Sequence, residues 1–156
     1  MADSAELDRA GPDHADLAWG DELLLGHPAM DRTHREFVDV VQAMSACSDA
    51  ELTTKLRVFI THAQAHFGEE DRDMAEAGFP AAACHADEHA AVLSSAHEVL
   101  ARVEAGDVPI GRAFVAELSR WFPSHVAHLD SALAHWLVKR RHGGAPVVLR
   151  RELTRA

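Results

Sequence analysis

The segment from His62 to Glu70 places two histidines and a glutamate at helical spacing. His62, His66 and Glu70 follow one another at intervals of four residues, in a stretch that is rich in helix-forming residues. Four steps along an α-helix turn a side chain by only about 40°, so the three side chains leave the same face. Imidazole and carboxylate groups are ligands for divalent iron, manganese, zinc and copper. The question is which other groups of the chain meet this face.

Other segments carry residues of the same kind. His34 lies in a first apolar stripe, His85 and His89 are four residues apart, and His125 precedes Asp130 by five residues. A lone inward histidine is usually a core or rim residue, and the chain has 12 histidines, so some regular spacings arise by chance. A whole layer of buried polar groups is different, because each unpaired group costs about 1 to 3 kcal/mol. A pair of metal ions would satisfy the layer together.

Composition restricts the class of protein. The chain has 156 residues, 47% of them hydrophobic, which is enough for one domain with one core. It lacks tyrosine and is rich in alanine and leucine, which favours helices over sheet. The net charge of −10 argues against a nucleic-acid partner, because phosphate binding depends on lysine and arginine.

The two cysteines, Cys47 and Cys84, lie far apart and form no CxxC pair. This spacing suggests neither a disulfide framework nor a thiolate zinc site, and both residues are interpreted as packing residues. No apolar run approaches the roughly 20 residues that span a bilayer, and the acidic N-terminus does not resemble a signal peptide. We therefore expect a cytoplasmic protein without a membrane partner; a protein partner is not indicated.

Helix signals divide the chain into a body and two ends. Apolar stripes and end signals predict helices over 31–47, 48–77, 80–106 and 109–142, joined by short connections. Four such segments predict an all-α, antiparallel up-down-up-down four-helix bundle over 19–142. Residues 1–18 are expected to form a flexible arm, and the basic residues of 143–156 a solvated tail.

The candidate ligands also match the pattern of a known family, in order and in spacing. The pattern is an aspartate three residues before a first histidine, then HFxxEE, HxxxH, and a tryptophan followed by HxxxxD. The chain carries it as Asp31-Arg32-Thr33-His34, His66-Phe67-Gly68-Glu69-Glu70, His85-Ala86-Asp87-Glu88-His89 and Trp121-Phe122-Pro123-Ser124-His125-Val126-Ala127-His128-Leu129-Asp130. Residues 19–140 resemble the hemerythrins, and among them the single-domain bacterial hemerythrins.

The resemblance implies a cofactor and a role for each ligand. Two iron ions would form an oxo- or hydroxo-bridged di-iron centre, and dioxygen would bind reversibly at the iron that is one ligand short, for storage, delivery or sensing. His85, His89 and His125 would hold one iron, His34 and His66 the other, and Glu70 and Asp130 would bridge the two.

The donor set agrees with reversible binding on chemical grounds. Ferritin-like sites pair two histidines with four glutamates, whereas this set has five imidazoles and two carboxylates and stabilises high-valent iron less. Two other functions remain open at this stage. One is a di-iron enzyme acting on peroxide or nitric oxide, with His62 or Glu69 as proton donor, and the other is a metal-storage or structural bundle that binds zinc.

Four apolar residues lie close to ligands on their own helices: Phe37, Phe67, Phe122 and Val126. They are expected either to enclose the dioxygen site, keeping water and protons away, or to serve only as core. His62 falls where the family has no ligand, so we interpret it as a residue beside the site or at its rim. His128 is interpreted in the same way.

The spacing of His125 and Asp130 poses a geometric problem. Five steps in a regular α-helix turn the second side chain by about 140°, which aims two ligands poorly at one centre. Pro123 already removes a backbone donor just upstream. We therefore predict a kink or an i→i+5 hydrogen bond between Ser119 and Asp130, because a π-bulge brings position i+5 nearly over i.

Overall fold

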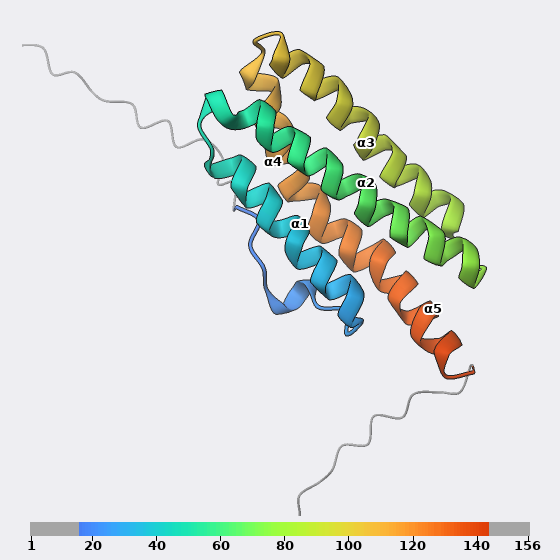
Figure 1. The fold of residues 1–156 in the computed structure, drawn as a ribbon. Coiled ribbons are helices and arrows are strands. Elements are labelled where there is room, and N and C mark those ends of the chain that lie inside the picture. The colour runs from blue at the N-terminus through green and yellow to red at the C-terminus, as the bar shows by residue number, and fades with distance from the viewer. Residues whose placement is uncertain (1–15, 144–156) are drawn as a thin grey trace, which may run out of the picture.

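The computed structural model describes residues 16–143, and this part of the chain is all-α. Successive helical rods run in opposite directions (Figure 1), which confirms the predicted four-helix bundle. Short 3-10 helices cover Asp21–Leu23 and Asp49–Glu51. The rods are α1 (Pro28–Ala46), α2 (Leu52–Ala77), α3 (Ala82–Glu104), and a fourth made of α4 (Val108–His125), a π-helical segment (Val126–Asp130) and α5 (Ser131–Arg141).

The helix ends follow the local sequence. Ser48 and Glu51 form the expected capping box, in which each side chain accepts a hydrogen bond from the other's backbone N–H. Gly78 ends α2 in the left-handed conformation at φ 60°, which glycine adopts without steric cost. The first helix begins at Pro28 and not near residue 31, because His27 caps it by accepting the N–H of Met30 at 3.3 Å.

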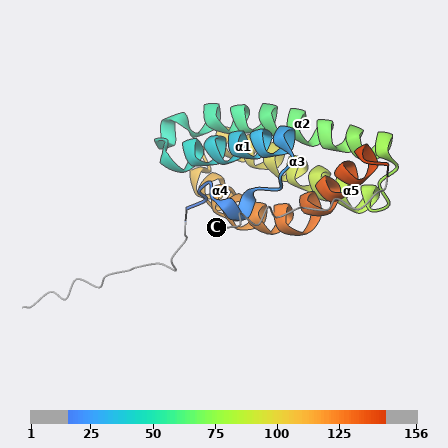
Figure 2. The ribbon, with the colours of Figure 1, turned by 90° about the horizontal axis from the view of Figure 1, so that it is seen from below.

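Each rod packs against two neighbours. α2 contacts α1 and α3, and α4 contacts the same two helices from the other side. Seen from below, α4 and α5 lie in line along the bundle (Figure 2). No helix in the described part of the chain has both the length and the apolar character needed to cross a membrane.

The core is divided into two apolar clusters, and the candidate ligands lie between them along three of the rods. In α1, Met30 belongs to the smaller cluster and Phe37 to the larger, with buried His34 between them. The same order recurs in α2 with Met74, Glu70 and Phe67, and in the fourth rod with Leu133, Asp130 and Val126. The larger cluster fills the core on one side of the ligands and the smaller cluster fills it on the other. Apolar packing therefore holds the polar layer in place from both sides.

The fourth rod contains the predicted irregularity. The backbone N–H of Ser131 donates to the carbonyl oxygen of Val126, five residues earlier, at the end of the π-helical segment. The i→i+5 alternative of the prediction is therefore confirmed, with Pro123 inside α4 just upstream. The π turn places Asp130 Oδ1 3.1 Å from His125 Nε2. A side chain five residues along the rod thus reaches the same centre as His125.

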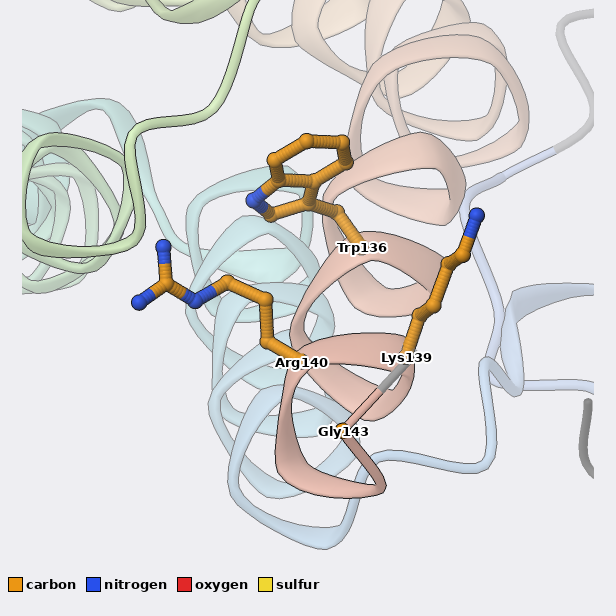
Figure 3. Close-up of a pocket in the computed structure, with 4 residues that line it drawn as sticks. All are labelled: Trp136, Lys139, Arg140 and Gly143. Carbon is orange, nitrogen blue, oxygen red and sulfur yellow. The ribbon is translucent and has the colours of Figure 1, made fainter. Parts of the chain in front are cut away.

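The ends of the bundle are tied to it by specific contacts. Trp136 Nε1 donates to the carbonyl oxygen of Ala77 at 3.0 Å, and Arg140 donates to the same oxygen. Both side chains lie on one side of α5, whereas Lys139 points to the other (Figure 3), and the three side chains line a hollow of about 270 Å³. Leu17, within the segment that we expected to form the N-terminal arm, is buried in the larger cluster. Residues 1–15 and 144–156, the rest of the expected arm and tail, lie outside the described residues.

Candidate metal centre

The seven predicted ligands meet inside the bundle. Each is at most 4% exposed, and each imidazole turns its Nε2 toward a carboxylate. Their donor atoms form two adjoining groups that share one glutamate. The first group is Glu70, His85, His89, His125 and Asp130, and the second is His34, His66 and Glu70.

Glu70 directs one oxygen to each group of imidazoles. Its Oε1 lies 2.9 Å from His66 Nε2 and 3.3 Å from His34 Nε2. Its Oε2 lies 3.3 Å from His89 Nε2 and 3.5 Å from His85 Nε2. This is the arrangement of a carboxylate that bridges two metal positions.

Asp130 repeats this arrangement on the opposite rod. Its Oδ2 lies 3.0 Å from His34 Nε2, while its Oδ1 lies 2.9 Å from His85 Nε2 and 3.1 Å from His125 Nε2. The two carboxylates thus join the same two groups of imidazoles from different helices.

The distances fit metal ions better than hydrogen bonds. His125 Nε2 lies 3.2 Å from His85 Nε2 and 3.3 Å from His89 Nε2, and one proton cannot satisfy three nitrogens. Neighbouring ligands of an octahedral ion with bonds of about 2.1 Å lie about 3 Å apart. Glu70 Oε2 and both oxygens of Asp130 are also buried without a hydrogen-bond partner. The donor set therefore fits a pair of metal ions.

Without metal, protons on some of the imidazoles offset the negative charge of Glu70 and Asp130. Burial alone would lower the pKa of His34, but the adjacent carboxylates of Asp130 and Glu70 outweigh it and raise this pKa to about 9. The same opposing causes raise the pKa of His85 to about 9. Burial would raise the pKa values of Glu70 and Asp130, but their histidine partners hold both well below the usual range. In the metal-free site, protons on His34 and His85 thus balance the charge of the two carboxylates, and a metal ion competes with these protons.

Two carboxylates that the sequence did not suggest orient the imidazoles. Asp71 Oδ1 lies 2.8 Å from His89 Nδ1, and Glu88 Oε1 accepts from Trp121 Nε1 at 2.7 Å and lies 3.5 Å from His125 Nδ1. Such partners fix the tautomer and direction of a metal-binding histidine. The only feature of the sequence that could have indicated these two residues is that each is next to a predicted ligand: Asp71 follows Glu70, and Glu88 precedes His89.

Aromatic rings cover the smaller group. Phe37 and Phe122 stack with ring centroids 4.0 Å apart, and both are fully buried. Phe37 contacts the ring of His66 at 5.8 Å, and Phe122 contacts that of His34 at 5.5 Å. Phe67 stacks on His89 of the larger group at 4.2 Å and also contacts the ring of His66 at 5.1 Å, so it contacts both groups. Val126 is also fully buried, so all four predicted pocket residues lie in the core, and their enclosing role stays a prediction.

His62 lies beside the two groups and belongs to neither. Its ring contacts those of His66 and Phe37, with centroids 5.5 and 6.1 Å away. Burial, followed by the charges of His66 and His34, lowers the pKa of His62 to about 4. Glu69, Cys84 and His128 are exposed. On α2, His66 and Glu70 thus supply the donors, and His62 lies beside the site without belonging to it.

The fold and this donor set define a helical bundle with two adjoining groups of potential metal ligands. The model of the hemerythrin HHE cation-binding domain matches residues 25–137. The chain belongs to the hemerythrin family, which confirms the resemblance found in its sequence.

Curated relatives match most of the chain. It is 38% identical over 124 residues to a bacteriohemerythrin of Ralstonia nicotianae, covering 80% of this chain and 90% of that protein. It is 28% identical over 122 residues to a bacteriohemerythrin of Stenotrophomonas maltophilia, covering 76% and 79%. A bacteriohemerythrin of Pseudomonas aeruginosa is 25% identical over 121 residues, covering 75% and 78%.

Proposed function

We propose that the chain binds dioxygen reversibly at a di-iron centre held by the seven buried residues. His85, His89 and His125 hold one iron, and His34 and His66 hold the other. Glu70 and Asp130 bridge them. Two ferrous ions supply the two electrons that reversible dioxygen binding requires. The family of the chain and the name of its relatives support this proposal.

The observation that carries the proposal is that two carboxylates are shared by two groups with different numbers of imidazoles, three in one and two in the other. Glu70 and Asp130 each direct one oxygen toward His34 and the other toward His85. Three imidazoles would hold one iron and two would hold the other, so the ion beside His34 and His66 would have one protein ligand fewer. An open position for a small ligand would therefore be expected beside His34 and His66, where no protein side chain would have to be displaced.

The surroundings of this position favour binding over enzymatic turnover. Phe37 and Phe122 stack on each other and meet the two imidazoles edge to face, which favours exclusion of water from that side. Glu69, one of the two proton donors considered for an enzyme, is exposed and therefore does not serve the centre. Five neutral imidazoles and two carboxylates also give less negative charge than a ferritin-like site. These features favour reversible binding over turnover.

An oxygen cycle tests the proposal. The metal-free protein is loaded with ferrous iron without air, dioxygen is admitted, and dioxygen is then removed under argon. We expect a visible charge-transfer absorption that appears with dioxygen and disappears on its removal, over repeated cycles. Oxidation that does not reverse would indicate an enzyme or an iron store, and an unchanged spectrum would contradict dioxygen binding.

A further inference from the structure

One buried polar atom outside the proposed ligand set lacks a partner. Among residues 16–143, the buried side-chain nitrogens and oxygens without a hydrogen bond all belong to proposed ligands, except Nε2 of His62. Leaving such an atom unpaired destabilises a protein. The unpaired atoms of Glu70 and Asp130 find their partner in the metal ions. The Nε2 of His62 has no such partner within the described part of the chain.

The ring of His62 lies on the side of the smaller group. It contacts the rings of His66 and Phe37, and the ring of Phe37 stacks on that of Phe122, which contacts His34. These are the residues around the position that the proposed function leaves open for a ligand. The buried tip of His62 thus belongs to the wall of that position and not to the wall of the larger group.

The other part of His62 reaches the surface. Its side chain is half-buried and lines a shallow groove of about 590 Å³ between α1 and α2. Val40, Val58 and Thr61 line the same groove. One part of the His62 side chain therefore lies at the surface groove, while its Nε2 is buried and its ring contacts His66 and Phe37.

We propose that His62 is a ligand-binding residue, whose Nε2–H donates a hydrogen bond to a small exogenous ligand at the open side of the centre. The class of ligand is a diatomic or a small anion that carries negative charge on its outer atoms when bound, such as dioxygen or azide. This inference rests on the proposed function, because it needs an open position beside His34 and His66.

Azide binding to the iron-loaded ferric protein tests the role of His62. His62→Leu keeps an apolar side chain at the position and removes the donor, whereas His62→Gln keeps an N–H donor. We expect azide affinity to fall about tenfold in His62→Leu, the factor that corresponds to one net hydrogen bond of about 1.4 kcal/mol. In His62→Gln it should stay within about threefold of the native value. Thr61→Val, an exposed neighbour in the same groove, is the matched control and should not change affinity.

Two further measurements separate a ligand-binding role from a structural one. The iron content of His62→Leu should equal that of the native chain, and its metal-free form should melt no lower, since the substitution removes an unpaired buried atom. A lower iron content would make His62 a metal ligand and overturn the inference. Unchanged azide affinity in His62→Leu would overturn it and leave the proposed function standing. A fully loaded native chain that binds neither azide nor dioxygen would refute the proposed function, and the inference with it.

Discussion

Replacing Glu70 by alanine is expected to abolish the binding of both metal ions. Glu70 belongs to both groups of donors, and its two oxygens face imidazoles of both. Removing it therefore takes one ligand from each metal position. Substituting even a residue that only supports a ligand costs 10 to 100-fold in metal affinity, so we expect a loss of more than about 100-fold at both positions.

Glu69→Ala is the matched control, because it removes an identical but exposed side chain one position away on α2. Iron per chain, measured after anaerobic loading and gel filtration, should be unchanged in this variant. It should approach zero in Glu70→Ala. One tightly bound iron in Glu70→Ala would contradict the bridging role, since it would mean that the two positions bind independently.

Removing the metals is expected to lower stability and to reverse its dependence on pH. In the metal-free protein, His34 and His85 have pKa values raised from 6.5 to about 9. Their contribution to the free energy of unfolding is fully present below about 6.5 and is lost as the pH rises through about 9. Glu70 and Asp130 have lowered pKa values, so their contribution is present above their unfolded values and is lost in acid. The metal-free protein should thus be most stable at mildly acidic pH.

Above pH 6.5, the stability of the metal-loaded protein should instead increase with pH. Metal binding displaces the protons of His34 and His85, so it strengthens as the pH rises toward 9. Free metal at 100 times its dissociation constant adds about 2.7 kcal/mol to the free energy of unfolding. Melting temperatures of both forms between pH 5 and 9 measure the difference. Equal melting temperatures, or a difference that shrinks with rising pH, would contradict a buried site of this kind.

The sequence predicted the parts of this structure that depend on spacing along one helix. The four-residue interval of His66 and Glu70, and that of His85 and His89, place each pair on one face, and the structure brings both pairs together. The five-residue interval of His125 and Asp130 does not fit a regular helix, and this misfit predicted the π-helical segment. Periodicity suffices in these cases because backbone geometry links sequence interval and direction.

Features that depend on how helices are rotated against each other could not be predicted in this way. Asp71 and Glu88 each lie one residue from a ligand, and a neighbour on a helix points about 100° away. Each reaches the site only because the adjacent rod brings His89 or His125 to it. The buried tip of His62 depends in the same way on where Phe37 packs.

X-ray absorption at the iron edge of the loaded protein is the most direct test of the central claim, which is that Glu70 and Asp130 bridge two metals. We expect iron surrounded by nitrogen and oxygen, with a second iron at roughly 3.5 Å, the spacing usual for paired metals. This iron–iron signal should remain in Glu69→Ala, the variant that is expected to keep both metals. A native chain whose bound iron shows no neighbouring iron would contradict the account, because its seven ligands would then serve a single metal or none.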